Sequence, residues 1–335
     1  MKKLHTHTHK AIRSTALGTT LLMTAALLAA CGGGGGGTPT TAGSTGTSTA
    51  PANSGTLASP TYPAGSEQLA AFEQLNAMRQ ECGFPTLGEN ALLDQSVANH
   101  MTYVQLNKAE GHYETEGNPG FTGVNWQDRA TYVGYPGHTG EVVAYDNSNS
   151  GGALSVVALA SVPYHEALMF EPFSEVGIDY AAVVLGPAST QYSLLMDLGY
   201  QGANAPTFSS APMTFPCQGS TDVDYESSAP ENPAPLGIDT GTNPIGTPIA
   251  VIGNASDTIV LSSGQLTAPG GAVINMDLLD SSNDANHEMQ PYEAAAFSAS
   301  PLQPNTTYMA TIVGTSNGNT FTKQFSFVTG NQGQF

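Results

Sequence analysis

An apolar run of 15 residues near the N-terminus, Ala16 to Ala30, determines how much of this chain is left to form a folded core. Basic residues precede the run and small residues end it, which is the layout of a secretory signal peptide. The run is short for a transmembrane helix. We therefore expect residues 1–30 to be removed on export, so that the rest of the chain folds in an oxidising compartment.

Cys31 follows the apolar run directly. The sequence Leu28-Ala29-Ala30-Cys31 resembles the bacterial lipobox, in which the chain is cut before the cysteine and the cysteine is acylated. The resemblance implies a lipid anchor at Cys31 and a place in the bacterial cell envelope, periplasmic or surface-exposed. Several acyl chains on one residue hold a protein stably at a membrane. Because Gly32 and not Asp follows the cysteine, the resemblance implies the outer membrane in a cell that has one; the alternative is an ordinary signal peptide with a chance cysteine.

Residues 32–65 are rich in Gly, Ser and Thr and carry no charged side chain. Such a segment has too few apolar groups to form a core. We expect residues 31–65 to be a lipidated cysteine followed by a flexible tether, which keeps the folded part near a membrane surface.

The charge of the chain excludes one class of partner. The net charge is −19, and removal of the signal peptide leaves four Lys and Arg against 27 Asp and Glu, a net charge of −23. Affinity for nucleic acids comes mainly from Lys and Arg that neutralise phosphates. With Arg79, Lys108, Arg129 and Lys323 as the remaining cations, we expect no nucleic-acid partner.

The region 66–204 has the pattern of an α+β domain. Ser66 precedes an apolar stripe with helical spacing that ends near Cys82, and further helices are expected over 91–106 and from Gly151 to before Pro163. Two strand-like runs follow, Glu175–Leu185 and Gln191–Gly199. Helices followed by a strand pair indicate a helical layer packed on a sheet.

The rest of the chain divides into a linker and a β domain. Residues 205–245 are rich in Pro, Ser and Gly and are expected to be a linker. Six short β-like runs fill 246–330, which indicates a small all-β sandwich. Leu302–Tyr308 resembles the loop and tyrosine before a late strand of fibronectin type III and other Ig-like domains. Gly314–Gly318 matches the G-x-S-x-G pattern of a nucleophile elbow, but a strand pattern follows it, so we expect a hairpin turn.

Two cysteines remain after Cys31. Cys82 and Cys217 are an even pair in an oxidising compartment, and a disulfide between them would close 135 residues. The alternative is a pair of buried free thiols.

The histidines beyond the signal peptide are His100, His112, His138, His165 and His287. His100 shares the apolar face of the second expected helix, which favours a packed structural role. His138 and His287 are expected in polar loops, although the closeness of His138 to Glu141 in the sequence leaves His138 as an alternative. The candidates for chemistry are therefore His112 and His165.

A family resemblance includes these two histidines. Its motifs are, in order, Leu75–Arg79, Leu92–Met101, Gly111-His112, Phe121, Arg129, Gly134-Tyr135, Gly140-Glu141, Pro163–His165 and Val176–Ile178. In order and spacing they resemble a bacterial CAP domain, of the superfamily of cysteine-rich secretory, antigen-five and pathogenesis-related proteins. The resemblance covers 66–204 and implies an α-β-α sandwich with two His and two Glu around a central cleft.

Carried over by position, the family's site residues are His112, Glu141 and His165. The chain departs from the family pattern at two places: Val142 replaces an Asn, and neither Ser161 nor Val162 supplies the second Glu. Two imidazoles and one carboxylate are a plausible ligand set for a divalent metal such as zinc. The alternative is a hydrogen-bonded polar cluster without metal. For hydrolysis a further carboxylate would be needed as base, and Glu110, Glu114 and Glu166 are near in sequence.

The sequence leaves three functions open. The leading hypothesis is a lipid-anchored envelope protein whose cleft binds a small molecule, a lipid or a protein partner, with no catalysis. The second is a metal-dependent hydrolase of peptide or envelope substrates that uses His112, Glu141 and His165. The third is a structural or adhesive surface protein in which the C-terminal sandwich makes the contacts.

Overall fold

Local capping starts both long helices where the sequence predicts them. The Ser66 hydroxyl accepts a hydrogen bond from the Leu69 amide at the start of α1 (Glu67–Glu81). The Asn90 side chain accepts from the amides of Leu92 and Leu93 at the start of α2 (Ala91–Asn107). These side chains satisfy amide groups that the first helical turn leaves without a partner.

The computed structural model describes residues 54–331, and these residues belong to one compact unit. The expected signal peptide and the lipidation of Cys31 lie outside the described residues. No helix in the described range is long and apolar enough to cross a membrane.

A four-stranded sheet forms the middle layer of the first half. Its strand order is β1-β3-β4-β2. The bounds are β1 (Gly88–Glu89), β2 (Gly137–Asp146), β3 (Glu175–Gly186) and β4 (Ser189–Gln201). β3 and β2 pair antiparallel with β4 on either side, and β1 pairs parallel with β3. The polar strand β2 and its pairing were not predicted from the sequence.

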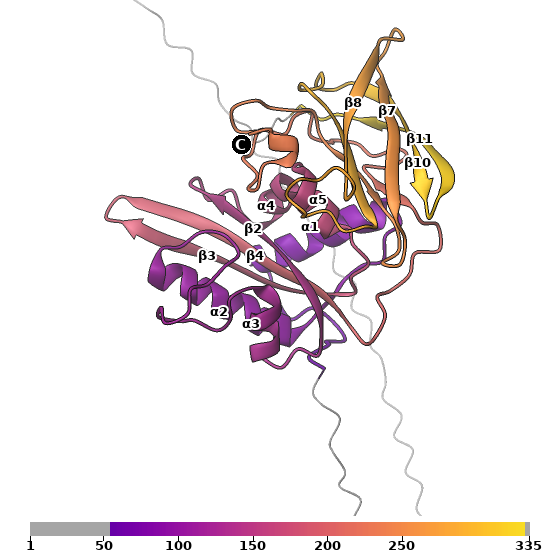
Figure 1. Ribbon diagram of the computed structural model, residues 1–335. Coiled ribbons are helices and arrows are strands. Elements are labelled where there is room, and N and C mark those ends of the chain that lie inside the picture. The colour runs from indigo at the N-terminus through magenta and orange to yellow at the C-terminus, as the bar shows by residue number, and fades with distance from the viewer. Residues whose placement is uncertain (1–53, 332–335) are drawn as a thin grey trace, which may run out of the picture. The chain divides into compact units, whose positions relative to one another are not determined.

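Helices cover both faces of this sheet, which gives the α-β-α layering (Figure 1). Because side chains alternate along a strand, Leu194 and Met196 of β4 pack on one side and Leu195 packs on the other. The first side is covered by α1, α4 (Gly152–Leu159) and α5 (Pro163–Met169), and the second by α2 and α3 (Trp126–Tyr132).

The C-terminal half is a curled antiparallel sheet of seven strands in the order β11-β10-β7-β8-β9-β6-β5. The bounds are β5 (Met213–Phe215), β6 (Ile249–Ile252), β7 (Ile259–Thr267), β8 (Val273–Asp280), β9 (Glu293–Ser298), β10 (Thr307–Ser316) and β11 (Asn319–Val328). The first part of β8 pairs with β7 and the rest pairs with β9. Side chains of β6 pack in one cluster with side chains of β10 and β11. The α+β class is confirmed, and all six expected β runs are strands.

The G-x-S-x-G pattern lies in the hairpin between β10 and β11. Asn317 and Gly318 have φ angles of 52° and 78°, as a tight two-residue hairpin turn requires. Gly314–Gly318 is therefore a turn, as the sequence predicts.

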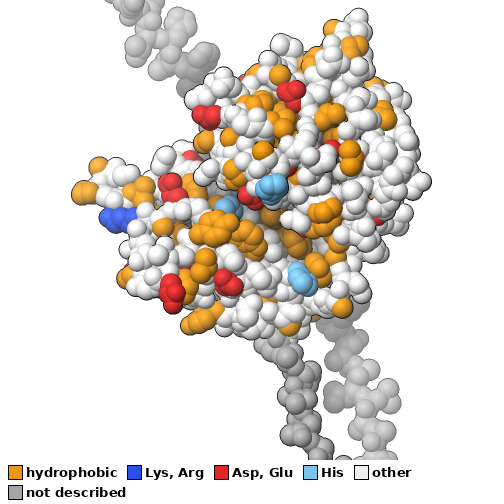
Figure 2. All heavy atoms as spheres, viewed as in Figure 1, with side chains coloured by type: hydrophobic (Ala, Val, Ile, Leu, Met, Phe, Trp, Pro, Cys, Tyr) orange, Lys and Arg blue, Asp and Glu red, His pale blue; other side chains and the backbone are white. Residues whose placement is uncertain are grey.

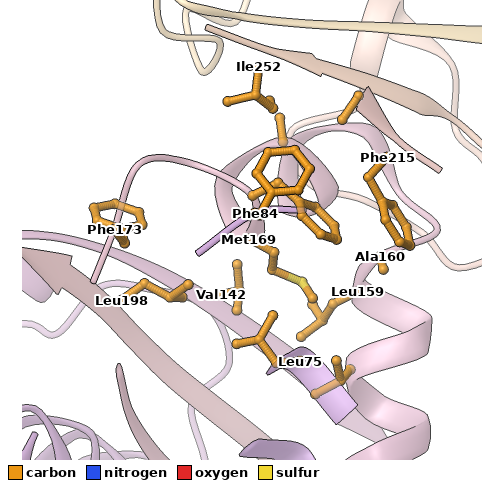
Figure 3. Packing of buried hydrophobic residues seen from close by; sticks show 14 of the residues in the cluster. Leu75, Phe84, Val142, Leu159, Ala160, Met169, Phe173, Leu198, Phe215 and Ile252 are labelled. Atoms are coloured by element: carbon orange, nitrogen blue, oxygen red, sulfur yellow. The ribbon is translucent and has the colours of Figure 1, made fainter. Parts of the chain in front are cut away.

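Residues 205–245 differ from the linker that their composition predicts. β5 adds an edge strand to the large sheet, and Phe208, Met213 and Phe215 are buried in a cluster that also contains helix residues of the first half. Figure 3 shows Phe215 and Ile252 in the same cluster as Leu159 and Met169. We call this cluster the shared core, because both halves of the chain contribute to it.

The C-terminal end of the expected tether also belongs to the folded unit. The Thr56 hydroxyl donates to Glu175, the Tyr62 hydroxyl donates to Asp94 over 2.7 Å, and Thr61 binds Glu89. Buried carboxylates need such donors. Residues 54–62 are thus fixed against β1, β3 and the start of α2.

The disulfide between Cys82 and Cys217 is confirmed, with a Cα–Cα distance of 5.5 Å. It joins the end of α1 to the segment that follows β5.

Because the disulfide closes 135 residues, its removal increases the entropy of the unfolded chain. We expect Cys82→Ala/Cys217→Ala to lower the free energy of unfolding by about 3–5 kcal/mol. Urea unfolding followed by the fluorescence of Trp126, the single tryptophan, measures this loss. Reduction of the wild-type protein should have the same effect, and an unchanged urea midpoint in both cases would contradict the prediction.

Candidate functional site

His112 is held from behind by a buried ion pair. Its Nδ1 lies 3.0 Å from Oε1 of Glu141 on β2, and Arg129 of α3 pairs with the other oxygen of that carboxylate. Arg129 also donates to the His112 carbonyl over 2.9 Å. Burial alone would raise the pKa of Glu141, but the Arg129 charge and the hydrogen bond from His112 lower this pKa to about 2. Because an ionised carboxylate only accepts, His112 donates from Nδ1.

The same face of the sheet carries a second buried carboxyl group. Asp197 on β4 lies opposite Glu141 in the strand register and is fully buried. Burial and the negative charge of Glu141 raise the pKa of Asp197 well above its ordinary value. Burial thus favours the uncharged form of Asp197, whereas Arg129 and His112 stabilise the ionised form of Glu141.

His100 belongs to the same buried layer. Its ring nitrogens contact Glu114 Oε1 at 3.0 Å and the Gly111 carbonyl at 3.1 Å, and its side chain is 1% exposed. The packed structural role that the sequence predicts for His100 is confirmed. Its contacts hold the loop that carries His112.

His165 is held by a residue that the sequence analysis missed. Its Nδ1 lies 2.7 Å from Oε1 of Glu231, which also accepts the amides of Tyr164 and His165 at the start of α5. A carboxylate at a helix N-terminus satisfies amides that lack an intrahelical partner. Glu231 comes from the segment expected to be a linker. No local sequence pattern indicates that Glu231 caps α5, because 66 residues separate it from His165.

The two histidines face one another across a cleft. Their ring centroids are 6.0 Å apart, and their side chains are 21% and 14% exposed. A cavity of about 750 Å³ adjoins both rings. Its walls are formed by Glu110, Gly111, His112, Tyr113, Val143, Ala144, Tyr145, Ala158, Leu159, Val162, His165, Ala229, Pro230, Asn232 and Pro233. Figure 2 shows histidine side chains beside a band of hydrophobic side chains on the face in view.

The expected site residues have different positions. His112 and His165 line the cleft, whereas Glu141 lies behind His112 with its side chain fully buried. Of the three nearby acids, Glu110 lines the cleft, Glu114 holds His100, and Glu166 is buried with neither carboxylate oxygen hydrogen-bonded. Ser161, near the place of the family's second Glu, donates to the Ala158 carbonyl.

The described residues contain no group of three or more His, Cys, Asp and Glu side chains with the geometry to hold a metal ion. Glu141 is occupied by Arg129 and His112, and the Nδ1 atoms of both histidines are occupied by carboxylates. The three residues expected as metal ligands are therefore arranged differently. His112 and His165 are two oriented imidazoles, and Glu141 lies behind His112.

Comparison with known proteins gives little direct information. No family model matches the chain, and no curated protein matches it. Among solved structures, an outer surface protein of Borrelia burgdorferi is similar over 41% of this chain and 93% of its own, with 12% sequence identity and a TM-score of 0.33.

Arg129 neutralises the buried charge behind His112, and its side chain is fully buried. Removal of one partner of a buried ion pair leaves the other charge without compensation. We expect Arg129→Gln to lower the free energy of unfolding by about 3–5 kcal/mol, whereas Lys323→Gln on β11 should change it by less than about 0.5 kcal/mol. Urea unfolding of both variants checks this, and equal losses would contradict the role of Arg129.

Glu166 makes stability depend on pH. Burial, followed by the negative charge of Glu231, raises its pKa well above the ordinary value of 4.5. The folded state therefore holds a proton that the unfolded state releases, and stability falls as the pH rises above about 4.5. One such proton gives a slope of about 1.4 kcal/mol per pH unit. We expect Glu166→Gln to remove this contribution to the pH dependence of stability above about pH 4.5. Urea unfolding at several pH values tests it, with Glu73→Gln on the exposed side of α1 as the control; parallel curves for all three proteins would refute the assignment.

Proposed function

We propose that this chain is a lipid-anchored protein of the bacterial cell envelope whose cleft binds a small, mainly apolar molecule. The export signal and the lipobox-like Cys31 support the location. The α-β-α layering supports the proposed CAP domain over residues 66–204, because it is the arrangement that the resemblance implies. The C-terminal sheet, residues 246–330, is proposed to be an Ig-like second domain.

The observation that carries the binding function is the cleft itself. A cavity of about 750 Å³ is within the size range of sites for small molecules. Val143, Leu159 and Val162 form apolar walls, and further apolar contact comes from Pro230 and Pro233. Burial of apolar surface against such walls supplies affinity. The two oriented imidazoles form the polar end that fixes the orientation of the ligand.

Binding is favoured over hydrolysis by the composition of the cleft. Among the described residues that line it, none is Ser, Thr or Cys, so the walls offer no side chain of the usual kind for nucleophilic attack. His112 and His165 are each held by a carboxylate, but neither has a nucleophile to activate there. Fixed imidazoles with free edges are suited to hydrogen-bonding a ligand.

Filling of the cavity tests this proposal. The neutral fluorescent compound N-phenyl-1-naphthylamine is titrated into the soluble chain of residues 52–335. Ala158 lines the cleft from α4, so Ala158→Trp should weaken binding at least tenfold. Leu154→Trp adds the same side chain at a position of α4 that is 37% exposed and outside the cleft, and should change binding less than twofold.

Thermal unfolding of both variants shows whether they keep the fold. Absence of binding to the wild-type protein, or equal binding to wild type and Ala158→Trp, would overturn the proposed binding function.

A further inference from the structure

The polar end of the cleft offers acceptors and negative charge. His112 and His165 each use Nδ1 to donate to a glutamate, so in the neutral imidazole the other nitrogen, Nε2, accepts hydrogen bonds. Within the described part of the chain neither Nε2 has a hydrogen-bond partner, and both rings line the cavity. A ligand group that donates several hydrogen bonds fits this pair of acceptors.

One further acid lines the same space, and a second lies in a loop that is fixed to the start of α5. Glu110 lines the cleft from the loop after α2. Glu288 comes from the loop between β8 and β9, where Asp284 accepts both the Glu288 amide, over 2.7 Å, and the Tyr164 hydroxyl, over 2.6 Å. Tyr164 is next to His165 on α5, so this contact fixes the loop beside the cleft. Burial, followed by the negative charge of Asp284, raises the pKa of Glu288.

No cation balances these acids among the described residues that line the cleft, because Lys and Arg are absent from its walls. The buried Arg129 is already paired with Glu141. Figure 2 shows Lys or Arg only at the left edge of the face in view, away from the histidines. An anionic ligand would meet uncompensated negative charge here, whereas a cationic ligand would neutralise it.

Aromatic rings add surfaces that suit a cation. Tyr113 lines the cleft and is 62% exposed, with its ring centroid 6.0 Å from that of Trp126. Tyr145 forms part of the wall and is fixed by hydrogen bonds with the backbone of Gly111. The faces of Tyr and Trp rings attract ammonium groups.

We propose that the cleft binds a molecule with a primary ammonium head on an apolar stem. This inference rests on the proposed binding function and specifies the class of ligand. The ammonium has three donors and no acceptor, so it matches the two Nε2 atoms, and its charge complements Glu110 and Glu288. The apolar stem lies along the walls that Val143, Leu159 and Val162 provide.

Three fluorescent compounds of similar size test the class of ligand on the chain of residues 52–335 at pH 8. Dansylcadaverine has a primary ammonium, its N-acetyl derivative is neutral, and dansyl-aminohexanoic acid is anionic. We expect dansylcadaverine to bind at least tenfold more tightly than the neutral compound, and the anionic compound to bind most weakly. The affinity for dansylcadaverine should also fall with rising salt, because the attraction involves exposed charges.

Charge variants identify the residues that select the head. Glu110→Gln/Glu288→Gln should weaken dansylcadaverine binding about five- to tenfold and leave the N-acetyl derivative unchanged. Glu73→Gln, an exposed acid on α1 outside the cleft, is the matched control and should change neither affinity. Displacement by hexylamine indicates a free amine as the source of the head, and displacement by Nα-acetyl-lysine amide indicates a lysine side chain of a partner protein; either supports the proposal.

The outcomes separate the two proposals. If N-phenyl-1-naphthylamine binds but the three dansyl compounds bind equally, the ammonium class is wrong and the binding function stands. The same holds if the glutamine variant weakens the charged and neutral compounds alike. If no compound binds, both proposals fail.

Discussion

The shared core determines where the His165 side of the cleft lies. Leu75 of α1, Met169 of α5 and Leu198 of β4 pack in one cluster with Phe215 of β5 and Ile252 of β6 (Figure 3). Close-packed side chains give a segment little freedom to shift, because displacement opens voids. Residues 205–245 run between β4 and β6 and are fixed by this packing and by the disulfide. Glu231 is therefore held beside His165 by contacts that lie far from the cleft.

A balance of buried charge fixes the His112 side of the cleft. Glu141 and Asp197 are neighbours on adjacent strands, and both are buried. Two buried like charges without full compensation are costly. Arg129 pairs with Glu141 and lowers its pKa, whereas burial and the charge of Glu141 raise the pKa of Asp197. His112 is aligned by Glu141 and His165 by Glu231. The two imidazoles thus depend on different parts of the chain, one on the sheet and α3, the other on the segment after it.

Local signals account for what the sequence predicted. Ser66 starts α1 by capping it, and alternating apolar residues identified the C-terminal strands, because each effect acts over a few neighbours. The sequence missed α5, which is short and is capped by the distant Glu231, and β2, whose Glu141 belongs to a buried ionic cluster. The family resemblance predicted that His112 and His165 share one site. The position of Glu231 could not be predicted, because it depends on packing between distant segments that no local pattern encodes. Pro and Gly made residues 205–245 look unstructured, although Phe208, Met213 and Phe215 supply the apolar surface that a free linker lacks.

The arrangement separates affinity from selectivity in the cleft. Apolar walls from β2, α4 and the segment 229–233 favour any molecule that removes their surface from water, whatever its charge. Selectivity has to come from polar groups that discriminate between ligand heads. In the cleft wall these groups are Glu110 and His112 in the loop before α3, and His165 on α5. All three side chains offer hydrogen-bond acceptors or negative charge. A ligand head group that only accepts hydrogen bonds therefore loses its bound water in the cleft and finds no donor there to replace it. Such a cleft discriminates between ligands mainly because an unmatched polar head group loses binding free energy. The gain from a matched head group contributes less.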